Sequence, residues 1–150
     1  QSDKHIYNIA DLSNNEASEG DFIYIMGFPM GIVAADRQHV FVRSGVISRI
    51  KDLFEGRSKD FVVDAFVFPG NSGGPVLTKP EFQSIQGTKA NINSRLIGIV
   101  KSYIPYTDVA ISQQTNRPRV IFEENTGLTK IEPVDHIIMT IEQAKKKTVP

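Results

Sequence analysis

The sequence predicts an all-β fold: a closed barrel of six strands followed by one α-helix at the C-terminal end. Two patterns support this fold class. Six short runs are rich in valine, isoleucine, phenylalanine and tyrosine, and are separated by glycine, proline, asparagine or charged clusters, which is typical of strands in a barrel. The final segment instead repeats its apolar residues at the spacing of an amphipathic helix.

The strand-forming runs follow one another through most of the chain. We expect strands over residues 22–28, 40–50, 61–68, 74–78, 95–103 and 119–122. The polar stretch 79–94 is predicted to form a long loop, and loops of this length are commonly functional or mobile.

The predicted helix covers residues 134–147. Its apolar stripe, expected to pack on the core, consists of Val134, Ile137, Ile138, Ile141 and Ala144. Pro133 suits the first turn, and Asp135 suits the positive end of the helix dipole. The run Lys145, Lys146 and Lys147 complements the negative end and is interpreted as a solvated helix terminus, with a binding patch as the alternative.

Residues 70–76, Gly-Asn-Ser-Gly-Gly-Pro-Val, are the most informative segment. A serine hydroxyl is a weak nucleophile, so a hydrolytic serine needs a base beside it and N–H donors for the oxyanion that forms. Glycines around Ser72 permit positive φ and close substrate approach. The nucleophile elbow of α/β-hydrolases fits poorly because it needs a helix after the serine, whereas Gly73, Gly74 and Pro75 oppose one.

The whole heptapeptide resembles the serine motif of the trypsin-like, chymotrypsin-fold peptidases. Segments 20–31, 42–48 and 96–100 resemble strands of the second barrel in the bacterial HtrA-like branch, and the resemblance spans about residues 17–143. It implies that residues 1–150 are the C-terminal antiparallel barrel of a peptidase domain, with residues 1–16 as the linker between two barrels.

The resemblance also implies a mechanism and a set of site residues. Ser72 would be the nucleophile of a serine endopeptidase that forms an acyl-enzyme, and the N–H groups of Gly70 and Ser72 would form the oxyanion hole. No metal or cofactor is implied. Peptide substrate would bind along Phe66, Phe68, Lys101, Ser102 and Tyr103. The alternative for Ser72 is a turn serine whose hydroxyl bonds nearby backbone.

The sequence also supports expectations about specificity, peptide binding and activation, which concern Phe66, Lys101 and Asn71. Phe66 lies six residues before Ser72, where a trypsin would have an aspartate, so we expect a medium apolar P1 residue. Phe66 and Phe68 could equally be core aromatics. An extended peptide would add as a strand beside Lys101 to Tyr103, although Lys101 could simply face solvent. Asn71 is neutral and cannot pair with a newly made N-terminal ammonium, so activation by that route is not expected.

The catalytic base of the resembled family is not found in this chain. His5, His39 and His136 are the only histidines, and none has the alanine–histidine context of the family's base. Neither Asp3 nor Asp11 leads an apolar strand, as the family's triad aspartate would. The triad histidine and aspartate are therefore expected upstream, on an N-terminal barrel, and the chain alone is expected to be inactive.

Two other functions remain open. A degenerate barrel could keep the serine loop as a turn and bind peptides without catalysis, or the same loop could serve an esterase or acyl transferase. The start at Gln1, without an initiator methionine or signal sequence, favours a fragment over a degenerate barrel.

Composition excludes several classes of protein. The 17 basic and 17 acidic residues balance, which argues against a nucleic-acid partner. No apolar run approaches the roughly 20 residues of a membrane span. The absence of cysteine excludes a disulfide-rich secreted scaffold and fits a bacterial protein of the cytoplasm or periplasm.

Overall fold

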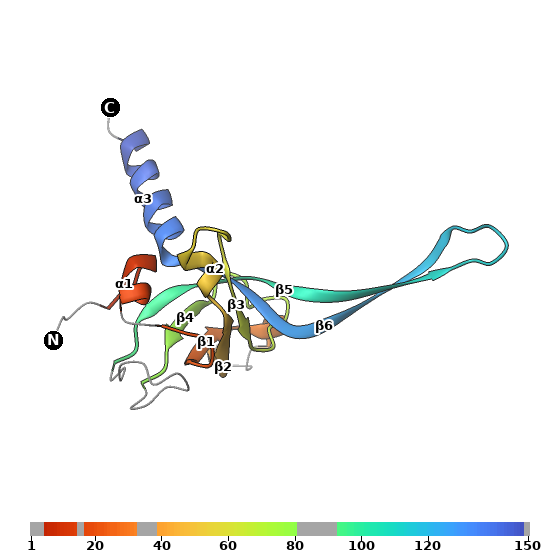
Figure 1. Cartoon of the computed structure of the whole chain (residues 1–150), viewed down its shortest axis with the longest axis horizontal. Coiled ribbons are helices and arrows are strands. Elements are labelled where there is room, and N and C mark those ends of the chain that lie inside the picture. Colours follow the sequence, from red (N-terminus) through yellow and green to blue (C-terminus); the bar gives the residue numbers. More distant parts are fainter. Residues whose placement is uncertain (1–4, 15–16, 33–38, 81–92, 149–150) are drawn as a thin grey trace.

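The computed structural model describes residues 5–14, 17–32, 39–80 and 93–148 of the chain. Its elements in order are α1 (Ile9–Asn14), β1 (Phe22–Gly27), the 3₁₀ helix η1 (Pro29–Gly31), β2 (Phe41–Arg49), α2 (Lys51–Phe54), β3 (Phe61–Asp64), β4 (Pro75–Thr78), β5 (Leu96–Ile111), β6 (Pro118–Pro133) and α3 (Val134–Thr148). Figure 1 shows a compact body from which two features project: the paired ends of β5 and β6, and helix α3.

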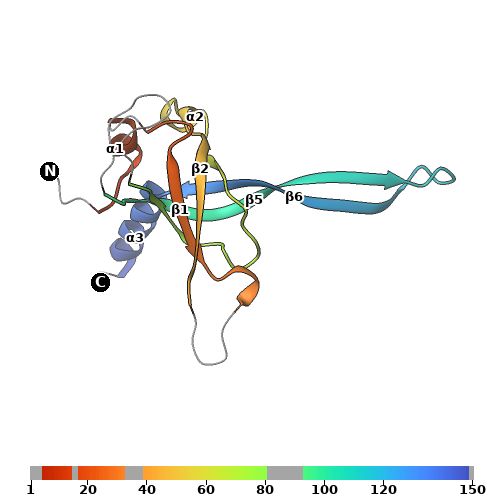
Figure 2. The ribbon, with the colours of Figure 1, turned by 90° about the horizontal axis from the view of Figure 1, so that it is seen from below.

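The strands form a closed barrel in the order β1-β2-β3-β6-β5-β4, and every neighbouring pair is antiparallel. The predicted fold class is confirmed: a closed six-stranded antiparallel barrel with a C-terminal helix. Closure comes from β4, which pairs with β1 on one side and with β5 on the other. Figure 2 shows β1 and β2 side by side from below.

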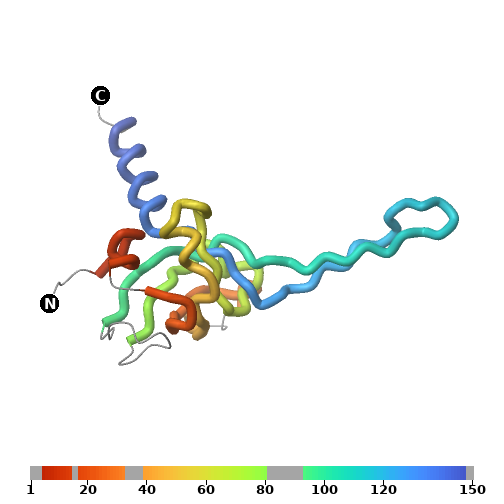
Figure 3. The backbone as a smooth tube through the Cα atoms, viewed as in Figure 1, coloured from red at the N-terminus to blue at the C-terminus, as the bar shows by residue number. Residues whose placement is uncertain are grey.

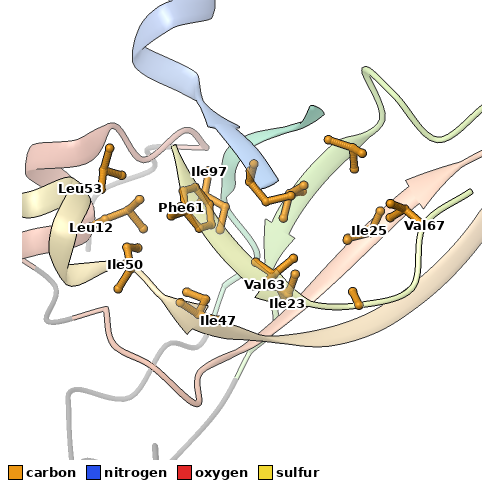
Figure 4. Close-up of a cluster of buried hydrophobic side chains, with 14 residues drawn as sticks. Leu12, Ile23, Ile25, Ile47, Ile50, Leu53, Phe61, Val63, Val67 and Ile97 are labelled. Atoms are coloured by element: carbon orange, nitrogen blue, oxygen red, sulfur yellow. The ribbon is translucent and has the colours of Figure 1, made fainter. Parts of the chain in front are cut away.

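The barrel interior is filled by aliphatic side chains that alternate along each strand. In β1, Ile23 and Ile25 are fully buried, whereas Phe22 before them is exposed and Tyr24 between them is only partly buried. The cluster continues across the barrel and up to α1 and α2 through Leu12, Ile47, Ile50, Leu53, Phe61, Val63, Val67 and Ile97 (Figure 4). Since burying one such side chain contributes about 1.5–3 kcal/mol, this core holds the strands that carry the serine loop.

Strands β5 and β6 are longer than the sequence predicted. Each has 16 residues, whereas we expected residues 95–103 and 119–122. Beyond Tyr103 the pair leaves the barrel as a two-stranded arm, defined here as residues 104–126 (Figure 3). The turn at its tip is closed by bonds from Ser112 N to Arg117 O and from Asn116 N to Ser112 O, with Asn116 at φ +52°.

Helix α3 is present where expected, but the prediction that its apolar stripe packs on the core was wrong. Only Val134 of the stripe is buried, while Ile138 and Ile141 are 37% and 49% exposed. The physical reason is direction: α3 continues straight from the end of β6 and projects away from the barrel (Figure 1). The side chains of Ile137 and Ile141 instead line an open groove with Ile99, Glu132, His136 and Thr140.

The two short α-helices, α1 and α2, were not predicted. Helix α1 lies in the expected linker 1–16, and its first turn is capped because Asn8 and Asp11 exchange side-chain-to-backbone bonds of 2.8 and 3.0 Å. The carboxylate of Asp135 accepts a 2.8 Å bond from the N–H of Ile9, which ties α1 to α3.

Residues 81–92 of the predicted loop 79–94 lie outside the described residues.

Candidate active site

The serine loop connects β3 to β4 and is held against β1 by close backbone approach. Gly70 has φ +97°, and a Cβ atom there would lie 2.4 Å from the carbonyl oxygen of Phe28. At Gly74 a Cβ atom would lie 2.2 Å from the carbonyl oxygen of Met26. Real side chains do not reach such distances, so glycine is required at both positions if the loop is to lie this close to the barrel wall.

Asn71 anchors the loop from inside. Its side chain is 1% exposed, its Oδ1 accepts a 3.2 Å bond from the N–H of Phe68, and its own N–H donates a 3.0 Å bond to the carbonyl of Phe68. The amide packs on Gly27, where a Cβ atom would lie 2.8 Å from Nδ2. A neutral buried side chain with bonded partners therefore holds the turn on which Ser72 lies.

Further bonds tie the loop to its neighbours. The N–H of Gly73 donates to the carbonyl of Val100 at 2.8 Å, and the N–H of Val100 donates to the carbonyl of Gly74 at 2.9 Å. On the other side, the N–H of Met30 donates to the carbonyl of Pro69 at 2.6 Å. Strand β5 and the η1 turn thus fix both ends of the loop.

The N–H groups of the two residues that flank Asn71 have no acceptor among the described residues. Asn71 and Gly73 donate inward, but the N–H groups of Gly70 and Ser72 donate to none of the described residues. Ser72 is exposed, and its hydroxyl makes no bond to the described part of the chain either. The loop therefore offers an exposed hydroxyl next to two available donors, which are the components of an acyl-transfer site.

The histidines are in three separate places, and none bonds to Ser72 within the described ranges. His5 precedes α1, and His39 is exposed in the approach to β2 rather than within a strand. His136 lies in α3, where its Nδ1 contacts the Glu132 carboxylate. Burial raises the pKa of Glu132, but hydrogen bonds and charges from Lys101 and His136 outweigh it and leave that pKa below its usual value.

The expected substrate residues of the segment before the loop face outward. Phe66 is 51% exposed, and Phe68 is partly exposed and lies under the Arg43 guanidinium at 5.3 Å from the ring centroid. The alternating residues Ala65 and Val67 point into the core. The alternative of core aromatics therefore does not fit Phe66 and Phe68, since neither belongs to the buried cluster.

On β5 the side chains and the backbone have different roles. The Lys101 ammonium pairs with Glu132 at 2.9 Å and with Asp60 at 3.1 Å, and these two partners raise its pKa. The Tyr103 hydroxyl donates to the Glu123 carboxylate, which raises the pKa of Tyr103. Ser102 is exposed. Because its ammonium group already pairs with Glu132 and Asp60, Lys101 can bind a peptide only through its backbone N–H and carbonyl groups.

Strand β6 forms one wall beside the expected substrate residues Phe66 and Phe68. The sequence prediction had placed the end of this strand at residue 122. Asn125 donates a 2.7 Å bond from Nδ2 to the carbonyl of Val67, and the carbonyl of Gly127 accepts a 2.9 Å bond from the N–H of Ala65. Gly127, at φ +82°, lies under the Phe66 ring. The signal that could have located this wall is the glycine itself, since a glycine inside a strand often marks close approach of another segment.

Among the described residues, no cluster of acidic, histidine or cysteine side chains could hold a metal ion. No helix in the described ranges is long and apolar enough to cross a membrane.

Comparison with known proteins agrees with this geometry. No curated protein and no solved structure gave a significant match. The family model of the trypsin-like peptidase domain matches residues 2–83, more than half of the chain, and the match includes β1 to β4 and the serine loop. On this match and this barrel, the chain belongs to the trypsin-like peptidase domain family.

Proposed function

We propose that the chain is the second barrel of a serine endopeptidase of the HtrA-like branch, with Ser72 as nucleophile. The observation that carries the proposal is that Ser72 is exposed and that the N–H groups of Gly70 and Ser72 donate to none of the described residues. The triad histidine and aspartate would come from an N-terminal barrel encoded upstream of Gln1, because no described histidine bonds to Ser72.

In this mechanism the upstream histidine removes the proton from Ser72 Oγ as the oxygen attacks the substrate carbonyl carbon. The oxyanion that forms accepts hydrogen bonds from the N–H groups of Gly70 and Ser72. The histidine then gives the proton to the leaving amine, which yields an acyl-enzyme. In the second half-reaction water attacks the acyl carbon while the histidine takes its proton, and the histidine returns a proton to Ser72 Oγ as the acid is released. The extended substrate would bind the backbone of β5 at Lys101 to Tyr103.

The proposed place for the N-terminal barrel is suggested by α3. The half-exposed side chains Ile138 and Ile141, and the open groove between α3 and β5, leave an apolar surface that a second barrel could cover. The ion pairs of Lys101 with Asp60 and Glu132 lie near this groove and would fix β5 below it.

The test is peptide hydrolysis by a polypeptide that joins the chain to its upstream segment. We expect turnover that is lost in Ser72→Ala and retained in Ser48→Ala, which removes an exposed hydroxyl on β2 away from the expected substrate residues. The 150-residue chain alone should show almost none, since losing the base in a comparable serine peptidase costs about 10⁶ in turnover. Ordinary peptidase rates from the chain alone would contradict the proposal.

A second candidate is a peptide-binding barrel without catalysis. The observation that favours it is the absence of any bond between Ser72 and a histidine in the described ranges. Peptide binding by the joined polypeptide, with neither peptide nor activated-ester turnover, would support this candidate. Ester turnover without peptide turnover would instead indicate an esterase or acyl transferase.

A further inference from the structure

The arm of β5 and β6 exposes apolar side chains on both of its faces. Paired residues share a face, so Val109 with Ile121 lie on one side and Phe122 with Val120 on the other. All are exposed, Ile121 by 65%. A two-stranded ribbon is only marginally stable in water, and its open edges are templates for another strand. The arm therefore has a surface suited to a further strand.

The outer edge of β6 is the more continuous of the two edges, because both strands pair regularly over 105–110 and 120–125 but only β5 has a proline there. From Val120 to Asn125 this strand pairs with β5 without a register shift, and its pairing with β3 begins only at Leu128. The edge of β5 contains Pro105, which has no N–H to donate. A strand added to the arm would thus find a continuous ladder on β6 but not on β5.

The sequence of that edge is complementary to itself. In residues 119–123, Arg-Val-Ile-Phe-Glu, an antiparallel copy centred on Ile121 places Ile121 opposite Ile121 and Val120 opposite Phe122. It also places Arg119 opposite Glu123, twice. Opposite charges and apolar pairs directly across a ladder are favourable, whereas like charges there are not. This charge pattern fits a second copy of the chain.

We propose that two copies form a symmetric dimer in which their β6 strands pair antiparallel, edge to edge, about a two-fold axis at Ile121. The product is a four-stranded sheet, β5-β6-β6-β5, with the same patch used by both copies. Arg119 falls at the register shift between Ala110 and Ile111 and has no paired residue on β5, so its side chain is available to Glu123 of the second copy. Glu123 already accepts the Tyr103 hydroxyl, and its carboxylate has lone pairs for Arg119 as well. The dimer does not depend on the chemistry of Ser72.

Cysteine cross-linking tests the axis directly, because the chain has no cysteine of its own. In Ile121→Cys the two thiols would face each other at a separation that suits a disulfide, so mild oxidation should give covalent dimer. Val109→Cys is the matched control, since Val109 is the β5 partner of Ile121 on the same face but not on the pairing edge. Equal cross-linking of both variants, or none of Ile121→Cys, would overturn the proposal.

Charge reversal tests the register without relying on one variant. Arg119→Glu and Glu123→Arg should each sediment as monomer, because each puts like charges opposite one another. An equimolar mixture of the two should restore the dimer as a heterodimer, which a misfolded variant could not do. A wild-type chain that stays monomeric at all concentrations would refute the dimer and leave the arm to another partner, as would a mixture that fails to associate.

Discussion

Replacing Gly70 by alanine tests whether close packing against the barrel wall shapes the serine loop. The substitution has two costs. A non-glycine residue in left-handed backbone costs about 1–2 kcal/mol, and Gly70 has φ +97°. In addition, the new Cβ atom would lie 2.4 Å from the Phe28 carbonyl oxygen, a backbone atom, so the loop or β1 must move. We therefore expect Gly70→Ala to lower the free energy of unfolding by about 3 kcal/mol or more.

Gly73 and Gly56 are matched controls. Both have positive φ, +80° and +70°, but a Cβ atom at either would meet nothing within 4 Å. Their alanine variants should therefore lose only the backbone cost, about 1–2 kcal/mol. Urea unfolding of the three variants, with equal denaturant slopes, measures the difference. The reasoning is refuted if Gly70→Ala is no less stable than Gly73→Ala.

Three further predictions concern the barrel, its ion pairs and its specificity. Thr129 is fully buried and donates a 2.7 Å bond to the Ala65 carbonyl, so Thr129→Val should cost about 1–3 kcal/mol in urea unfolding, and the exposed Thr107→Val almost nothing. The pKa of Glu132 is lowered in the folded chain, so its contribution to stability is present above its unfolded pKa and is lost as the pH falls through the folded pKa. The Glu132→Gln variant should therefore lose less stability on acidification than the unsubstituted chain. Identical profiles of unfolding free energy against pH for the two proteins would disprove the linkage. The active polypeptide should cleave after apolar residues, and Phe66→Asp should move the preference towards arginine and lysine; a profile already dominated by basic residues would contradict the apolar site.

The barrel could be predicted from sequence because its strands alternate buried and exposed residues, as Phe22, Ile23 and Ile25 do in β1. The arm could not, because it has no buried face to impose such alternation. In residues 104–126 apolar and polar side chains are mixed on both faces, and only the run 119–122, which contains Val120, Ile121 and Phe122, was predicted as a strand. The apolar stripe of α3 was visible, but a stripe does not specify what it packs against.

The site was predicted unevenly for similar reasons. The glycines around Ser72 revealed the loop, since their spacing reflects local backbone demands. The outward direction of Phe66 and Phe68 and the ion pairs of Lys101 depend on long-range pairing, which spacing alone does not encode. Asn125 and Gly127 were missed because they lie at the base of the arm, in a strand predicted to end before them.

Covalent labelling at Ser72 tests the central claim most directly. The polypeptide that joins the chain to its upstream segment would be treated with a fluorophosphonate and examined by intact mass and peptide mapping. We predict a single adduct on Ser72 that is absent from Ser72→Ala and unaffected by Ser48→Ala. No adduct, or an adduct that persists in Ser72→Ala, would contradict the assignment of Ser72 as the nucleophile.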